Sequence, residues 1–155
     1  MVPTEEKAEW LERIRDIFDN KIPFNRVLGL KVHSINMERP KIRFAMHDAL
    51  VGNYIRGSLH GGVISAVIDV TGGLSAFMGL QKKLAGEPLD IKLEKFRKLG
   101  TIDLRIDYLR PGVGKMFEAT GYVLRTGHKV AVTRIELKNE TEQLIAVGTG
   151  AYVIA

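Results

Sequence analysis

The feature that most constrains this chain is Val63–Leu80, VISAVIDVTGGLSAFMGL, a segment that is apolar on nearly every side. A helix of this kind must be surrounded by other structure or by lipid. Asp69 lies near its middle, and a charged carboxylate at the centre of a bilayer costs on the order of 2.5–3.5 kcal/mol on insertion scales. We therefore predict a buried central helix over residues 60–80 and no membrane span.

Strand patterns surround this helix. Ile102, Leu104, Ile106 and Tyr108 alternate with polar residues up to Pro111, which is typical of a half-buried strand. Further strands are predicted at 28–37, 41–47, 115–125, 129–137 and 143–154. Short polar turns join the last three, so we expect an antiparallel meander. The polar stretch 47–58 is interpreted as a loop.

Two segments outside the sheet are also predicted. Residues 1–22 form an extra N-terminal helix, because Trp10, Ile14 and Phe18 make one apolar stripe and Thr4 can cap its start. Pro23 is expected to end it. Residues 81–98 are charged and contain glycine and proline, so we expect a connector or flexible lid with a short helix over 89–96.

Together these elements predict one α+β domain over residues 1–155. An antiparallel sheet of five to six strands would wrap around one long central helix. The sheet alone leaves one side of that helix open. A second copy of the chain is the simplest way to close it, so we expect a homodimer.

Composition excludes several classes of function. The chain has no cysteine, which removes disulfides, cysteine-ligated metals and thiol nucleophiles, and its four histidines are scattered, so no metal site is expected. The net charge is +5, but no basic stripe with interleaved aromatics appears. This favours a solvated face or a small anionic ligand over nucleic acid. The N-terminus lacks a signal-peptide pattern, so a cytoplasmic location is expected.

The start of the central helix is the first candidate site. His60, Gly61 and Gly62 fall where backbone N–H groups are unpaired and the helix dipole is positive, which suits an anion or a carbonyl oxygen becoming one. Glycine lets a ligand oxygen come close to the backbone. His60 is interpreted either as a base or as a structural cap.

Asp69 is the second candidate. It lies about 12 Å along the helix from Gly61, too far to act on the same substrate atom. An antiparallel copy of the helix would bring its own Asp69 beside this Gly61, which predicts composite sites at a two-fold interface. The alternative is that Asp69 bonds Ser65 or a strand backbone and only fixes the packing.

These residues resemble the hotdog-fold acyl-CoA thioesterases, in particular their phenylacetyl-CoA (PaaI-like) branch. The resemblance rests on Asn53, the LHGG at Leu59–Gly62, Asp69, the strand TIDLRIDYLRP and the hairpin VLRTGHKVAV at Val123–Val132. It covers nearly the whole chain from Leu28 onward.

The resemblance implies a role for each site residue. Gly61 would supply the oxyanion-hole N–H, His60 would shape that loop, and Asp69 of the partner subunit would activate water or attack the thioester itself. Asn53 would lie near the thioester, and Thr101 would hold the attacking water. The substrate-binding residues it implies are Gly62 at the helix start, and Arg110, Arg125, His128 and Lys129 for the phosphates and nucleotide of coenzyme A.

The resemblance also implies acyl-CoA as substrate, no cofactor beyond the coenzyme A that is part of that substrate, no metal, and a homodimer that assembles as a dimer of dimers. Two alternatives stay open. One is an acyl-thioester hydratase or dehydratase. The lack of an Asp five residues before His60 counts against this alternative. The other is a non-enzymatic acyl-CoA binding protein.

Overall fold

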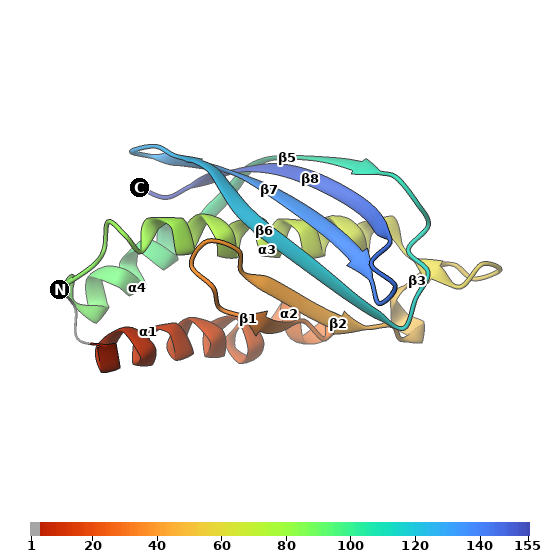
Figure 1. The fold of residues 1–155 in the computed structure, drawn as a ribbon, viewed down its shortest axis with the longest axis horizontal. Coiled ribbons are helices and arrows are strands. Elements are labelled where there is room, and N and C mark those ends of the chain that lie inside the picture. The colour runs from red at the N-terminus through yellow and green to blue at the C-terminus, as the bar shows by residue number, and fades with distance from the viewer. Residues whose placement is uncertain (1–3) are drawn as a thin grey trace.

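A six-stranded antiparallel sheet wraps around one long helix, α3 (Gly61–Leu80), in the computed structural model, which describes residues 4–155 (Figure 1). The strand order is β1-β2-β6-β7-β8-β5. The strands are β1 (Lys31–Ser34), β2 (Lys41–Ala45), β5 (Gly100–Tyr108), β6 (Met116–Thr126), β7 (Val130–Asn139) and β8 (Leu144–Val153). This confirms the predicted architecture, with β1 and β5 as the two edge strands.

The central helix is buried as its hydropathy predicts. It is long and apolar enough to cross a membrane, the one such helix within residues 4–155, yet 72% of its most apolar stretch is buried inside the protein. Val67, Ile68, Leu74 and Phe77 on this helix are fully buried. The apolar surface therefore faces the sheet and the N-terminal helices, and the fold accounts for it without lipid.

The N-terminal region forms a layer of helices on the side of α3 away from β6 and β7 (Figure 1). It consists of α1 (Thr4–Asp16), a π-helical turn η1 (Ile17–Lys21) and α2 (Pro23–Leu28). The predicted stripe is confirmed, because Trp10, Ile14 and Phe18 are all buried. The first three residues of the predicted segment 1–22 lie outside the described residues.

The predicted strand 28–37 is wrong at both ends. Pro23 does end the first helical run, but it also occupies the first turn of α2, a position where its missing N–H is no loss. Gly29 then ends α2 in the left-handed conformation, with φ +73°. The strand therefore covers only Lys31–Ser34.

The predicted loop 47–58 is also wrong, because most of it is ordered structure. A 3₁₀ turn, η2 (Asp48–Leu50), leads into a small hairpin of β3 (Val51–Asn53) and β4 (Ser58–Leu59). The strands are short enough that their alternation is not visible in the sequence. This hairpin delivers the chain directly to the start of α3.

The connector after α3 carries the predicted short helix, α4 (Leu89–Lys98). Phe96 on α4 packs edge-to-face on Phe18 and on Phe77, with ring centroids 5.9 and 5.3 Å apart. The helix is thus fastened to η1 and to α3 at once. Its position makes it a wall of the space beside α3.

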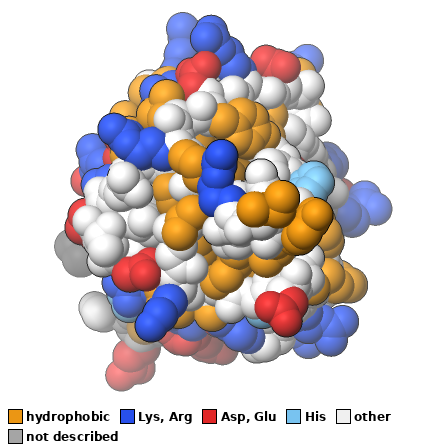
Figure 2. All heavy atoms as spheres, turned by 90° about the vertical axis from the view of Figure 1, so that its right-hand side faces the viewer, with side chains coloured by type: hydrophobic (Ala, Val, Ile, Leu, Met, Phe, Trp, Pro, Cys, Tyr) orange, Lys and Arg blue, Asp and Glu red, His pale blue; other side chains and the backbone are white. Residues whose placement is uncertain are grey.

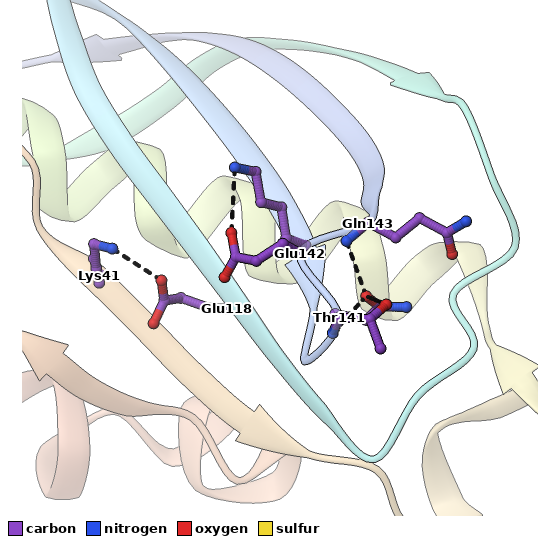
Figure 3. A network of polar contacts seen from close by, with 7 residues as sticks. Lys41, Glu118, Thr141, Glu142 and Gln143 are labelled. Atoms are coloured by element: carbon purple, nitrogen blue, oxygen red, sulfur yellow. Dashed lines mark hydrogen bonds and ion pairs between the residues drawn. The ribbon is translucent and has the colours of Figure 1, made fainter.

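The outer face of the sheet is held by polar contacts (Figure 3). Glu118 on β6 accepts hydrogen bonds from Arg43 and, at 3.0 Å, from Lys41 on β2. Burial alone would raise the pKa of Glu118, but the bonds from Arg43 and Lys41 outweigh it and hold the pKa below its usual value. In the β7–β8 turn, Asn139 Oδ1 accepts from the backbone N–H groups of Thr141 and Gln143.

Candidate active site

The hairpin β3–β4 and the start of α3 enclose an open hollow. It measures about 550 Å³ and is lined by residues 52–55 and 58–61. The structure therefore brings together Asn53, His60 and Gly61, three residues that the sequence singled out. Figure 2 faces this end of the molecule and shows hydrophobic side chains on its surface. Tyr54 and Ile55 at the hairpin tip are 85% and 84% exposed.

His60 caps the helix rather than offering a free base. Its Nδ1 accepts a hydrogen bond from Gly62 N–H at 2.8 Å, so a neutral ring carries its proton on Nε2. The Gly62 N–H is consequently occupied. The Gly61 N–H has no partner within residues 4–155, as expected for the first residue of a helix. Gly61 is thus the free donor in this hollow.

Asn53 closes the hairpin. Its Oδ1 accepts from the backbone N–H of Arg56 at 3.1 Å, and its carbonyl oxygen accepts from Gly57 N–H at 2.8 Å. These bonds fix a turn typical of asparagine. The side chain is exposed and lines the same hollow as Gly61.

Asp69 is held by two hydroxyl groups from the sheet. Thr101 on β5 donates to Asp69 Oδ1 at 2.8 Å, and the Tyr152 hydroxyl on β8 lies 3.3 Å from the same oxygen and 2.9 Å from the Asp69 carbonyl. Ser65 bonds the Gly62 carbonyl, so the alternative partner predicted for Asp69 is wrong. The Thr101 hydroxyl therefore orients the half-buried carboxylate, and the Tyr152 hydroxyl shares its one proton between the Asp69 carbonyl and Oδ1.

Tyr152 is the residue that sequence reasoning missed. It is 1% exposed, and burial, followed by the charge of Asp69, raises the pKa of its phenol, so the hydroxyl remains a donor. A Cβ at Gly72 would lie 2.2 Å from the Tyr152 oxygen, so glycine there makes room for the ring. The alternation of β8 would have placed Tyr152 inward, but not against Asp69.

An apolar cavity of about 190 Å³ opens beside Asp69. Its walls come from η1, α2, α3, α4, β5 and β8; they are Phe18, Ile22, Phe24, Asn25, Val70, Gly73, Phe96, Leu99, Gly100, Thr101 and Tyr152. An apolar cavity of roughly 150 Å³ already holds a benzene ring. The space therefore suits a hydrocarbon group next to the carboxylate.

One chain does not bring Asp69 and Gly61 together. They stand about 12 Å apart along α3. One end of β5 contacts Asp69, and the other end of β5 contacts Gly61. Thr101 near its start contacts Asp69, and Tyr108 at its end donates to the Gly61 carbonyl at 3.2 Å. Tyr108 is 54% exposed on the strand face that carries Leu104 and Ile106 toward the core, and Ile102, at the irregularity between Thr101 and Asp103, is exposed to the same extent.

The predicted coenzyme A residues do not form one patch in a single chain. Arg110 follows β5 and donates to the carbonyl of Leu144, at the start of β8. Arg125, His128 and Lys129 lie at the β6–β7 turn, at the other end of the sheet. All four are exposed. Within residues 4–155, no His, Cys, Asp or Glu cluster is arranged to hold a metal ion.

Known proteins share this sequence and this fold. The medium/long-chain acyl-CoA thioesterase YigI of Escherichia coli is 39% identical over 99% of this chain and 97% of its own. A solved Shewanella oneidensis protein related to the thioesterase superfamily is 41% identical, with a TM-score of 0.94 and complete coverage of both chains. A solved protein from Syntrophus aciditrophicus is 48% identical over 98% of this chain and 100% of its own, with a TM-score of 0.88.

A family model describes the same relationship. The thioesterase superfamily model matches residues 56–146, which include α3, Asp69, Thr101 and the β6–β7 hairpin. With the sheet wrapped around α3, this confirms the hotdog fold that the sequence predicts. The chain belongs to the thioesterase superfamily.

Proposed function

We propose that this protein hydrolyses acyl-CoA thioesters at sites built from two copies of the chain. The observation that carries the proposal is Asp69, held by Thr101 and Tyr152 beside an apolar cavity. The unpaired Gly61 N–H at the other end of the same helix segment supplies the complementary group. The similarity to YigI, a medium/long-chain acyl-CoA thioesterase, supports this substrate class.

The edge strand β5 offers a simple way to join two copies. Antiparallel pairing about a two-fold axis at Arg105 would place Leu104 opposite Ile106 of the partner subunit and, across the irregularity between Thr101 and Asp103, Thr101 near Tyr108 of the partner subunit. Thr101 is hydrogen-bonded to Asp69, and Tyr108 is hydrogen-bonded to Gly61. Each Asp69 would therefore approach the partner's Gly61. The pairing would also cover the exposed side chains of Ile102 and Tyr108 on this edge strand.

In such a site the thioester carbonyl oxygen accepts the Gly61 N–H. Asp69 of the partner subunit takes a proton from water as the water oxygen attacks the carbonyl carbon. The tetrahedral oxyanion is stabilised by Gly61 and the helix dipole. The C–S bond then breaks, and the departing thiolate of coenzyme A takes up the proton. Direct attack by Asp69, forming an anhydride that water cleaves, uses the same groups.

The residues around Gly61 and Asp69 indicate where the acyl chain and the coenzyme A part of the substrate would bind. The acyl chain would enter the cavity beside Asp69, between α2 and α4. The reversal of β5 across the two-fold axis would bring Arg110 of one copy and the basic β6–β7 hairpin of the other to the same end of the paired sheet. These cations suit the phosphates of coenzyme A.

The test is to measure the hydrolysis of acyl-CoAs of increasing acyl length. The free thiol of coenzyme A that the reaction releases is the readout. Asp69→Ala should lower kcat by about 10²–10⁴, the usual contribution of a positioned base. Asp90→Ala is the matched control, because Asp90 is an exposed carboxylate on α4 outside the cavity. Wild-type rates in a folded Asp69→Ala protein would remove Asp69 from the mechanism. Binding of every acyl-CoA without thiol release would favour a binding protein instead.

A further inference from the structure

A second cavity lies near the C-terminal end of α3, between α1, the turn after α3 and α4. It measures about 440 Å³, within the range of roughly 300–1,000 Å³ typical of small-molecule sites. It is lined by Lys7, Trp10, Leu11, Met37, Gln81, Lys82, Leu84, Ala85 and Lys92. Gln81 stands twelve positions after Asp69, about 18 Å along the helix, so this cavity is separate from the one beside Asp69.

Lys92 is the unusual member of this lining. It is only 6% exposed, and its ammonium group has no hydrogen bond or ion pair with any of residues 4–155. Its ammonium nitrogen lies 5.5 Å from the centre of the Trp10 ring, which is a cation–π contact. The ammonium nitrogen keeps contact with solvent and has no counter-ion among the described residues, so an anion in this cavity would find a partner already in place.

The other residues that line this cavity divide into a positively charged edge and an apolar wall. Lys7 and Lys82 are exposed at its edge, and no carboxylate lines it. Glu6 and Glu9 border a smaller adjoining hollow of about 110 Å³ that Lys92 also lines, but neither carboxylate forms an ion pair with Lys92. An anion is therefore favoured on the side of the three lysines.

The apolar part of the wall has few free polar groups. Trp10 Nε1 donates to Gln81 Oε1 at 2.6 Å, and Gln81 Nε2 donates to the Phe77 carbonyl. These two side chains satisfy each other and leave their carbon surfaces toward the cavity. Leu11, Met37 and Leu84 complete an apolar wall.

We infer that this cavity binds a monocarboxylate with an apolar tail, a fatty-acid anion. The carboxylate sits against Lys92, with Lys7 and Lys82 adding positive potential, and the tail lies along Trp10, Leu11 and Leu84. The site stands on its own residues and does not depend on the proposed hydrolysis. The free acid released by that reaction nevertheless has this chemistry, so the product would be bound at a second place.

Trp10 makes the site directly observable, because it is the single tryptophan of the chain. The full chain is titrated with decanoate, 1-decanol and decyltrimethylammonium while Trp10 emission and binding heat are followed. Decanoate should give a saturable change, decanol should bind about tenfold more weakly or worse, and the cation should not bind. Asp69→Ala should retain the decanoate response, which separates this site from the proposed catalytic one.

Variants of neighbouring lysines complete the experiment. Lys92→Met keeps the length of the side chain and should weaken decanoate binding by about tenfold or more while leaving decanol unchanged. Lys82→Met, at an exposed position where folding is safe, should weaken it roughly 2–5-fold. Lys83→Met is the control, since Lys83 bonds the Gly127 carbonyl and lies outside the cavity. Equal affinity for decanoate and decanol, wild-type binding by Lys92→Met, or no saturation by either measurement would overturn the inference.

Discussion

The two ends of the helix segment Gly61–Asp69 present opposite kinds of chemistry. At Gly61 the site is an open hollow whose free donor is a backbone N–H, and the histidine beside it is occupied as a cap. At Asp69 the site is an apolar cavity whose reactive group is a carboxylate held by two hydroxyls. One end has a donor without a base and the other has a base without a free donor. The proposed hydrolysis of a thioester needs both groups, so in that proposal each end supplies half of a site.

Removing the donor at the open end should cause a large loss of activity. Gly61→Pro deletes the N–H at the first position of α3, where proline is tolerated, and His60 already has the extended ψ of 136° that precedes proline. The expected loss of kcat is about 10²–10³, as for one oxyanion-hole donor. The measurement is steady-state hydrolysis of the best acyl-CoA.

Gly61→Ala is the matched control for that variant. It keeps the N–H, and its Cβ would meet the Tyr108 ring at 3.5 Å, an ordinary contact. It should therefore retain most of the activity. If alanine and proline at this position lowered kcat equally, the donor role of the backbone N–H would be wrong and the loss would reflect shape alone.

Mixing two defective chains tests whether the halves come from different copies. Gly61→Pro and Asp69→Ala are unfolded together and refolded, so that about half of the dimers contain one chain of each kind. Each mixed dimer then has one intact site, and the mixture should recover about a quarter of wild-type activity, well over tenfold more than either variant alone. A mixture no more active than the separate proteins would mean that both groups act within one chain.

The sequence predicts the two ends of the site unequally. The central helix and Asp69 follow from an apolar segment with one carboxylate in it, a pattern that only burial explains. The alternation of β5 likewise predicts a half-buried strand. The cavity beside Asp69 was not predictable, because Phe24 and Tyr152 lie 45 and 83 positions from Asp69 and meet it only through tertiary packing.

Local sequence patterns gave wrong or incomplete predictions where one short segment is compatible with two different structures. Pro23 stops one helix and starts another, so a single residue served two opposite roles. The hairpin of β3 and β4 is too short for a period of two to appear. The hydrogen bond from Gly62 to His60 was equally hidden, since a histidine cap and a histidine base occupy the same place in sequence.

A smaller effect is expected from narrowing the cavity at Asp69. Gly73→Ala adds a Cβ that would meet Tyr152 at 3.6 Å and Leu99 at 3.9 Å, so it fits without strain while occupying the cavity floor. Replacing glycine in a helix interior should raise the free energy of unfolding by about 0.5–1 kcal/mol. Hydrolysis of long acyl chains should nevertheless fall by up to about tenfold, with short chains unaffected.

Enlarging the same cavity should change the acyl-length preference in the opposite direction to Gly73→Ala. Phe24 lines the cavity, whereas Val27 is exposed on the same short helix and does not. Phe24→Ala should shift the preferred acyl length, and Val27→Ala should leave it where it was. An identical length profile in Gly73→Ala, Phe24→Ala and wild type would show that the acyl chain binds elsewhere.

The smallest effect is expected on the outer face of the sheet, away from both ends of the site. Glu118→Gln removes the charge that Arg43 and Lys41 hold between β2 and β6. Figure 3 shows the contact with Lys41. The folded-state pKa of Glu118 lies below its unfolded value, so its contribution is fully present above roughly pH 4.3 and is lost as the pH falls through the folded-state pKa. At pH 7 the variant should lose about 0.5–1 kcal/mol in the free energy of unfolding, since the pair is only partly covered. Denaturant unfolding should show this gap closing in acid, while kcat at pH 7 stays unchanged. A loss of kcat there would mean that the two ends of the site are coupled through the sheet and not only through β5 and α3.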